Sequence, residues 1–232
     1  MGASSITPRT KISKPIFTDR VGYIQQLDLQ LMQTEAKRQK VRFEVTALPG
    51  TFAAPGRVLG YIKPEEETES INSDKFEAAF RIGKKRTFDD DPRFGLIVLS
   101  EIACRALSPG INDPGTAISV IGTLVRIFSR WLTPPEEKPE ACLYDLVEVP
   151  ALQLEDMYDD AFSLIARDGA GSIELVTRLA KAYEALIWIS DPDVSRVTEE
   201  HARTSLQRAQ DALAPAELEK LNALFERLGM QS

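Results

Sequence analysis

The sequence contains few of the residues from which many enzymes build metal or nucleophile sites. Its 232 residues include one histidine, His201, and two cysteines, Cys104 and Cys142. These side chains do not supply the ligands of a zinc site or a histidine-centred hydrolytic triad. Because Glu199 and Glu200 precede it, we expect His201 at the surface, while Cys104 lies among apolar residues and is expected to be buried. Two such cysteines are expected to stay reduced.

Long apolar runs and an excess of positive charge are also missing. No stretch approaches the ~18 apolar residues of a membrane-spanning helix, and the purely aliphatic run in the central apolar segment is only Leu96–Leu99. The net charge of −7 and the pI of about 5.0 argue against a nucleic-acid-binding protein, which needs a clustered basic surface. With 43% hydrophobic residues and a mean hydropathy of −0.18, the chain is expected to be a water-soluble domain with a sizeable core.

The N-terminal part predicts a helix and then a small β unit. Apolar residues recur at helical spacing from Asp19 to Lys40, and Val41–Ala47 alternates as a half-buried strand does. Pro-Gly turns lead to a second apolar segment, Val58–Ile62, and Phe76–Ile82 alternates again. The turn Pro49–Gly56 has the P-G-x-F-x-x-x-G spacing of half a barrel-sandwich module. The lysine that carries biotin or lipoate has no counterpart there, which disfavours a carrier function.

The C-terminal part predicts helices separated by Pro and Gly breaks, and we assign the chain to the α+β class, mainly α-helical with a small antiparallel β unit near the N-terminus. We expect a linker or truncation remnant over residues 1–18, a helix plus β subdomain over 19–91 and a helical domain over 92–232. The predicted elements of the last part are a short strand at Leu143–Val149 and helices at Phe94–Leu107, Pro114–Trp131, Leu152–Ala166, Ile173–Ile189, Val197–Leu213 and Pro215–Leu228.

The segment Ala106–Ala117, which reads ALSPGINDPGTA, is the most informative stretch. It joins two apolar, helix-periodic segments through a turn rich in polar and special-backbone residues. Asp91-Pro92 and Asp113-Pro114 each place a carboxylate at the N-cap and a proline at the first helical position. Ser108-Pro109-Gly110 is typical of a helix stop, and Asn112 tolerates turn conformations. The turn is therefore expected to be rigid without any ligand.

Charged residues near the two helix starts suggest a binding site. An exposed helix N-terminus beside arginine can hold a carboxylate or phosphate, and aspartates can hold a hard divalent cation. The alternative is that Glu101 and Arg105 form an i,i+4 pair and the other charges are solvated. The candidate ligand-binding residues are Arg86, Asp91, Arg105, Ser108, Asn112, Asp113 and Thr116. No cofactor motif such as G-x-G-x-x-G or a P-loop is present, and we expect no cofactor.

Four segments together resemble a family of uncharacterised bacterial predicted membrane proteins, domain of unknown function twenty-two fifty-four. Gly22–Gln25 is similar to the family's G-Y-[IV]-Q segment, and Pro49–Gly56 is similar to its P-G-x-[FY]-x-x-x-G turn. Gly83–Asp91 matches G-x-x-R-T-x-x-x-D, and Ala106–Ala117 matches the family's longest motif almost letter for letter. The resemblance extends from Gly22 to Trp131 and is looser in the later helices.

The resemblance implies an integral membrane protein with N-terminal transmembrane helices and a soluble portion like this one. We therefore expect the full-length protein in the cell membrane, with this chain as a truncated soluble portion, on a side of the membrane that the sequence does not reveal. The expected partners are its own transmembrane region, other copies in a homo-oligomer and a small ion, but not nucleic acid.

Three functions stay open at this point. The first is a regulatory or gating domain that binds a small anion or divalent cation at residues 106–117. The second is a non-catalytic oligomerisation or interaction scaffold in which the turn is architectural. The third is an acid/base enzyme that uses Asp91 or Asp113, which is disfavoured because a capping aspartate has a lowered pKa.

Overall fold

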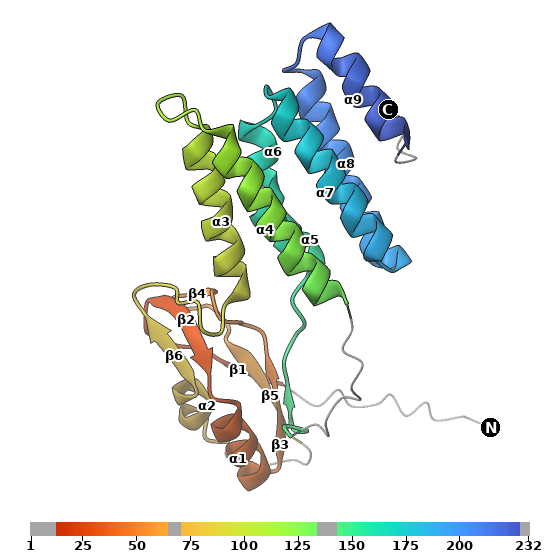
Figure 1. Ribbon diagram of the computed structural model, residues 1–232. Coiled ribbons are helices and arrows are strands. Elements are labelled where there is room, and N and C mark those ends of the chain that lie inside the picture. Colours follow the sequence, from red (N-terminus) through yellow and green to blue (C-terminus); the bar gives the residue numbers. More distant parts are fainter. Residues whose placement is uncertain (1–12, 65–70, 134–142, 228–232) are drawn as a thin grey trace, which may run out of the picture. The chain divides into compact units, whose positions relative to one another are not determined.

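The computed structural model describes residues 13–64, 71–133 and 143–227 (Figure 1). The chain divides into two compact units, one of Met1–Pro92 with Pro139–Ala151 and the other of Arg93–Lys138 with Leu152–Ser232. Within the described residues the strands all belong to the first unit, and the second unit is helical. The predicted α+β fold, mainly helical with a small β part near the N-terminus, is confirmed.

Short strands form two sheets in the first unit, with order β1-β5-β3-β7 in one and β4-β2-β6 in the other. The described pairs are antiparallel except β3–β7, which is parallel. β1 falls inside residues 1–18, where we predicted a linker, because its backbone pairs with β5. The strands are β1 (Lys14–Ile16), β2 (Gly22–Leu27), β3 (Val41–Val45), β4 (Phe52–Ala53), β5 (Gly60–Pro64), β6 (Phe80–Gly83) and β7 (Val147–Glu148).

The single helix predicted over Asp19–Lys40 is wrong. The first part is β2, and helix α1 (Leu29–Gln39) begins only after Asp28, whose carboxylate accepts the N–H of Leu31 at 2.8 Å. The apolar residues of this segment fit helical spacing, but pairing with β4 and β6 decides the local structure. A Cβ at Gly22 would collide with the carbonyl oxygen of Gly83, and such a close approach suits a paired strand.

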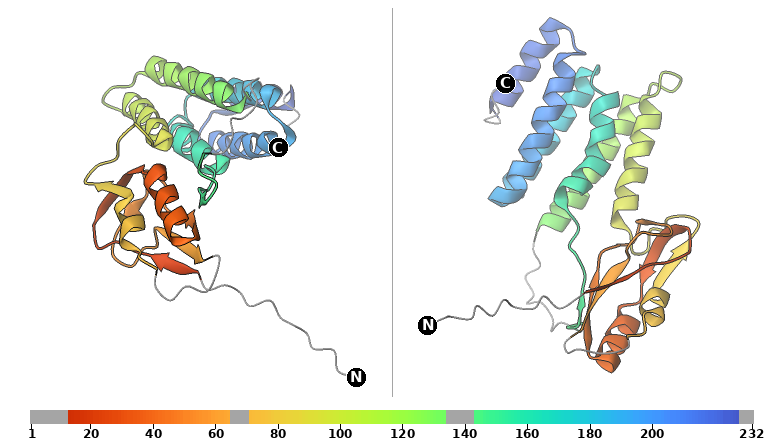
Figure 2. Two further views of the ribbon diagram at one scale, coloured as in Figure 1. Left: turned by 90° about the horizontal axis from the view of Figure 1, so that it is seen from below. Right: turned by 180° about the vertical axis from the view of Figure 1, so that it is seen from behind.

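The strand predicted over Phe76–Ile82 is half correct. Its first part is a short helix, α2 (Asp74–Ala78), and its second part is β6. Phe76 and Phe80 are both fully buried. The ring of Phe43 in β3 stacks on that of Phe76, with centroids 4.7 Å apart, and meets that of Phe80 edge-on, with centroids 6.3 Å apart. Helix α2 and strand β6 thus each contribute one phenylalanine to the same core. Helices α1 and α2 lie in the first unit with the sheets (Figure 2).

The second unit contains the helices that the sequence predicted, with boundaries close to those expected except at one helix, which was predicted to begin at Val197 and begins at Pro192. The additional feature is η1, a π-helix in the middle of the helix predicted over Leu152–Ala166. The packing of α4, α7 and α8 side by side forms the centre of the unit (Figure 1). The elements are α3 (Pro92–Leu107), α4 (Pro114–Leu132), α5 (Leu154–Tyr158), η1 (Asp159–Ser163), α6 (Leu164–Asp168), α7 (Ile173–Ile189), α8 (Pro192–Gln210) and α9 (Pro215–Arg227).

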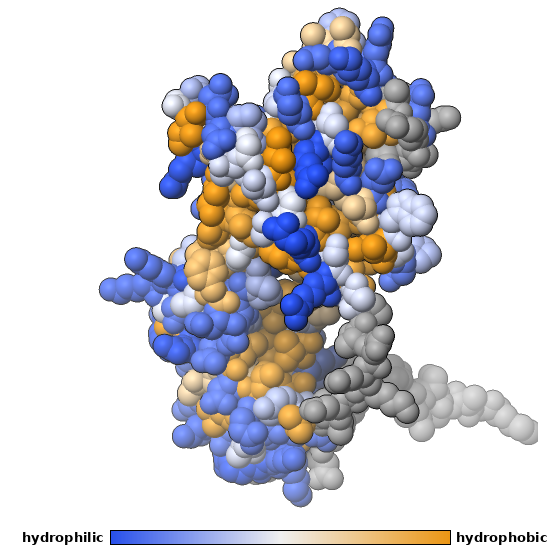
Figure 3. Space-filling view, viewed as in Figure 1, coloured by the Kyte–Doolittle hydropathy of each residue, from blue (hydrophilic) through white to orange (hydrophobic). Residues whose placement is uncertain are grey.

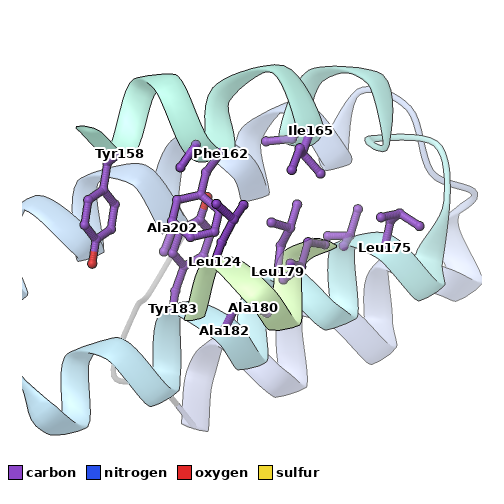
Figure 4. Close-up of a cluster of buried hydrophobic side chains, with 14 of the residues drawn as sticks. Leu124, Tyr158, Phe162, Ile165, Leu175, Leu179, Ala180, Ala182, Tyr183 and Ala202 are labelled. Carbon is purple, nitrogen blue, oxygen red and sulfur yellow. The ribbon is translucent and has the colours of Figure 1, made fainter. Parts of the chain in front are cut away.

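Aromatic side chains from three segments form the core of the second unit. The ring centroid of Phe128 in α4 lies 4.7 Å from that of Tyr158 and 5.6 Å from that of Phe162. The ring centroids of Phe162 and Tyr183, in α7, are 5.4 Å apart. Figure 4 shows Phe162 and Tyr183 pointing toward the same space as Leu124. All five side chains are fully buried. Aromatic contacts of this kind strengthen packing beyond the burial of apolar area.

Candidate functional site

A buried ion pair joins Arg86 to Asp91 in the first unit. Arg86 Nε donates to Asp91 Oδ2 at 2.7 Å, and Arg86 Nη2 donates to Oδ1 at 2.8 Å. The side chain of Asp91 is 2% exposed and that of Arg86 is 20% exposed. A two-point guanidinium–carboxylate contact fixes the relative orientation of both groups. It closes the end of the loop that leads from β6 to α3.

Gly50 lies directly against this ion pair. Its φ is +88°, a backbone conformation that favours glycine. A Cβ at this position would lie 2.6 Å from Arg86 Nη2 and would collide with the Asp91 carboxylate. The Pro-Gly turn and the G-x-x-R-T-x-x-x-D segment, well separated in the sequence, therefore meet at one point.

The G-Y-I-Q segment completes the arrangement. The N–H of Gly50 donates to the carbonyl of Ile24 at 2.8 Å, and the N–H of Ile24 donates to the carbonyl of Thr51 at 2.9 Å. From the same strand, Gln25 Nε2 donates to the carbonyl of Lys85 at 2.8 Å. We call Gln25, Gly50, Arg86 and Asp91 the loop cluster. Three of the four motifs singled out in the sequence contribute to it.

A cavity of about 190 Å³ lies beside the loop cluster. Its lining combines amide, hydroxyl, carboxylate and guanidinium groups, so it suits a small polar molecule better than an apolar one. The lining residues are Gln25, Gln26, Arg81, Thr87, Asp89 and Asp90.

The fourth motif forms the turn between α3 and α4 in the second unit. Ser108 Oγ donates to the carbonyl of Arg105 at 2.7 Å, and the N–H of Asn112 donates to the carbonyl of Ser108 at 2.9 Å. Asn112 has a φ of 49°, in the left-handed region that asparagine tolerates. The N–H of Asp113 then reaches back to the carbonyl of Ala106 at 2.8 Å. The turn is held by its own backbone, as the sequence indicated.

Asp113 caps α4 as predicted. Its Oδ1 accepts the N–H of Thr116 at 3.1 Å, and its Oδ2 accepts Thr116 Oγ1 at 2.6 Å. The hydroxyl hydrogen bond first, and then backbone N–H groups of Thr116 and Gly115, hold the pKa of this carboxyl below its usual value. Both carboxylate oxygens are therefore engaged, and the first N–H groups of α4 already have a partner.

The seven candidate residues fall into two groups. Arg86 and Asp91 belong to the first unit, whereas Arg105, Ser108, Asn112, Asp113 and Thr116 belong to the second. The 16 residues of α3 lie between Asp91 and the turn, a length of about 24 Å at the rise of an α-helix. The ligand-binding role of these residues stays a prediction.

The predicted pair between Glu101 and Arg105 is wrong. Both side chains are exposed, and no ion pair joins them within the described part of α3. Exposed pairs at this spacing contribute little, so solvation of the two charges competes well with their contact. Arg105 instead contributes its backbone carbonyl to the turn, as the acceptor for Ser108.

The comparison with protein families follows the motifs that the loop cluster and the turn contain. A family model described as "Predicted membrane protein (DUF2254)" matches residues 3–185, which is more than half of the chain. The chain belongs to this family. The DUF2254 match includes both the loop cluster and the α3–α4 turn, which agrees with the resemblance seen in the sequence.

Curated relatives of this DUF2254 chain include uncharacterized proteins of Mycobacterium bovis and Mycobacterium tuberculosis. One from each species is 32% identical over 119 residues. The match covers 50% of this chain but only 23% of each relative's length. No solved structure matches the chain significantly. Within the described residues, the helices are too short or too polar to cross a bilayer.

His201 is a functional candidate that sequence reasoning missed. We predicted a surface position, but its side chain is only 15% exposed and its ring lies 5.3 Å from that of Tyr158. Burial lowers the pKa of His201, and this outweighs the opposite effect of Asp159. The acidic neighbours in the sequence suggested an exposed side chain. In the structure, α8 instead places the imidazole of His201 against Tyr158.

Two carboxylates, one in α5 and one in η1, are also engaged in a way the sequence did not reveal. Arg93 Nη1 contacts Asp156 Oδ2 at 2.6 Å, and Arg93 Nε contacts Asp160 Oδ2 at 2.5 Å. Across residues 13–64, 71–133 and 143–227, no group of three or more His, Cys, Asp or Glu side chains is arranged to hold a metal ion. Cys142 lies outside the described residues, and Cys104 is half-buried with a free thiol.

Proposed function

We propose that this chain is a regulatory or gating module of a membrane protein, in which the loop cluster passes a conformational change to α3. The observation that carries the proposal is the position of the Arg86–Asp91 ion pair. The boundary between the two compact units falls between Pro92 and Arg93, one residue beyond Asp91. The pair therefore fixes the last residues of the first unit before the chain enters the second.

The physical basis is the rigidity of the loop cluster. A buried, two-point ion pair has few alternative arrangements, and leaving either charge without the other is costly. Gly50 holds the Pro-Gly turn against the pair, so a displacement of that turn disturbs Arg86 and Asp91 directly. A ligand in the neighbouring cavity would contact Gln25 and Thr87 and would act on the same loop. Regulation in this form requires a second packing of the cluster, in which the Pro-Gly turn moves and the ion pair rearranges.

Binding of a small anion or divalent cation at residues 106–117 remains a second form of this proposal. The turn geometry favours an architectural role, because Asp113 already occupies the N–H of Thr116. We therefore assign the regulatory input to the loop cluster and the rigid corner to the turn. An acid/base enzyme is disfavoured, since Asp113 has a lowered pKa and Asp91 is held by Arg86.

Hydrogen exchange measured by mass spectrometry tests the coupling. Asp91→Asn removes the charge that holds Arg86 with almost no change in shape. The matched control is Glu35→Gln, which breaks the partly buried pair between Glu35 and Arg38, 2.7 Å apart, elsewhere in the first unit. The proposal expects amides of α3 to exchange about tenfold faster in Asp91→Asn and unchanged in Glu35→Gln. Equal effects of the two substitutions on α3, or no effect of Asp91→Asn beyond the first unit, would refute the coupling.

An interaction scaffold is the second candidate function. The observation that favours it is the exposure of large apolar side chains on the helical unit, where Trp188 is 84% exposed and Trp131 and Ile102 are each 46% exposed. Apolar side chains reach the surface in the view of Figure 3. Light scattering after size-exclusion chromatography would show a homo-oligomer that Trp188→Ser and Ile102→Ser shift toward monomer. A monomer at all concentrations would exclude self-association through these side chains.

A further inference from the structure

A polar cavity of about 250 Å³ opens within the helical unit. Three helical segments surround it: α5 with the π-helix η1, α7 and α8. Nine of its ten lining residues carry a hydroxyl, carboxylate, imidazole or guanidinium group, and Val197 is the apolar exception. The lining residues are Glu155, Asp159, Ser163, Tyr183, Val197, Glu200, His201, Thr204, Ser205 and Arg208.

The π-helix shapes one wall of the cavity. Its first and last residues, Asp159 and Ser163, face each other, and Ser163 Oγ donates to Asp159 Oδ1 at 2.8 Å. The carbonyl of Ser163 accepts Arg208 Nη1 from α8 at 3.1 Å. Single π-turns inside α-helices are frequent at functional sites, because they redirect side chains and backbone groups.

Buried hydroxyl groups form the inner wall. Tyr183 is fully buried and Ser205 is 5% exposed, and their oxygens lie 3.1 Å apart. Burial raises the pKa of Tyr183, so its hydroxyl stays neutral. The inner wall therefore offers neutral hydrogen-bonding groups next to Val197.

Negative charge dominates the outer part. Glu155, Asp159 and Glu200 all act electrostatically on His201, which places three carboxylates around one imidazole. Burial keeps that imidazole neutral at pH 7, and Arg208 is the positive group of the lining. Arg196 lies 3.8 Å from Glu155 on its exposed side and offsets part of the charge. At least one net negative charge remains, so the cavity favours a cation.

The size and donor set restrict that cation to a small organic one. Within the described residues, the three carboxylates and the imidazole of the lining are not arranged to hold a metal ion. At roughly 30 Å³ for each water molecule, the volume holds about eight waters, or a ligand of about ten non-hydrogen atoms. An ammonium group suits carboxylates, and a short alkyl chain suits Val197 and the apolar part of the lining.

We propose that this cavity binds a small aliphatic amine, with Asp159 and Glu200 holding its ammonium group and the Tyr183–Ser205 pair bounding its inner end. The site lies in the second unit and does not depend on the coupling through the loop cluster. Either proposal stands if the other fails.

His201 provides a direct reporter, because it is the one histidine in the sequence. In a chain without a histidine tag, the imidazole Hε1 proton gives one assigned NMR signal. We would titrate 1,4-diaminobutane at constant ionic strength and pH, with sodium chloride and sodium acetate as controls. The expected result is a saturable shift of the His201 signal with the diamine and no saturable shift with either salt.

Matched substitutions locate the binding site. Asp159→Asn combined with Glu200→Gln should weaken diamine binding at least about tenfold. Glu199→Gln removes the same charge one residue away on α8, outside the cavity lining, and should change binding less than about twofold. Both carboxylates of the double variant are exposed, and the dispersion of the amide spectrum checks its fold. Absence of saturation by the diamine, saturation by acetate instead, or equal weakening by Glu199→Gln would overturn the proposal.

Discussion

The backbone of Gly50 passes so close to the carboxylate of Asp91 that a Cβ at residue 50 would collide with Oδ2. This relationship links a turn after β3 to the residue that precedes α3. It explains why two separate motifs of the chain belong to one structural feature.

Gly50→Ala should therefore destabilise the first unit by about 2–4 kcal/mol, since it combines a strained positive φ with overpacking against the ion pair. Gly56→Ala is a matched control, because Gly56 has a φ of +87° but a methyl group there would meet no atom within 4 Å. Only the backbone strain, roughly 1 kcal/mol, is expected at this position. Urea unfolding of both variants measures the difference, and equal losses would contradict the role of the close approach.

Asp91→Asn should lower the free energy of unfolding by roughly 3 kcal/mol, because the buried ion pair loses one of its two charges. Replacing both partners, as Arg86→Met with Asp91→Leu, should cost less than either Arg86→Met or Asp91→Leu alone for the same reason. A double-mutant cycle in urea checks this. If the double variant loses the sum of the two single effects, the ion pair does not act as a unit.

His201 should make stability depend on pH. Because burial lowers its pKa in the folded state, the unfolded chain takes up a proton first as the pH falls. The stability contribution of neutral His201 is present above about pH 6.5 and is lost as the pH falls through the lower folded-state pKa. Asp159, Glu200 and Glu155 oppose this shift, and Arg208 adds to it.

Unfolding midpoints of wild type and His201→Gln between about pH 7.5 and 5 test the expectation. As the pH falls, the unfolding midpoint of wild type should decrease more than that of His201→Gln. A pH-independent difference would show that the imidazole does not titrate differently in the folded chain.

Cys104 should react slowly with alkylating reagents. Burial first, and then a hydrogen bond with Asp168, raises the pKa of its thiol to about 12. Since only the thiolate reacts, alkylation by iodoacetamide at about pH 8 should be at least a hundredfold slower than in urea. Site-resolved mass spectrometry distinguishes Cys104 from Cys142. Similar rates in folded and unfolded chains would contradict the assignment.

The sequence was sufficient for most helices of the second unit and for the turn because their signals are local. Asp113-Pro114 specifies a cap and a first helical residue, and the structure shows Asp113 bonded to Thr116 as that pattern requires. The ends of α4 and α7 follow from apolar periodicity and flanking breaks alone. Such features need no knowledge of distant parts of the chain.

Most of the failures depended on distant partners; the Glu101–Arg105 pair, four residues apart on α3, is the local exception. Tyr23 and Ile24 fit a helix by spacing, but pairing with β4 and β6 makes them a strand. The contact of Gly50 with the ion pair links residues that no local pattern connects. His201 was misplaced because its inward position depends on Tyr158 and the π-helix, not on its acidic neighbours. Tertiary context decides these cases.

The π-helix η1 also constrains how this segment can change in length. A π-turn accommodates one residue more than an α-turn, so Asp159–Ser163 contains the equivalent of a single inserted residue between α5 and α6. Inserting a further residue would exceed what the π-turn absorbs and would rotate one flank against the other by about 100°. Tyr158 would then swing away from Phe128, and the wall containing Ser163 would turn from the cavity. Deleting one residue would instead convert the π-turn into a regular α-turn, so this stretch tolerates the loss of one residue better than the gain of one.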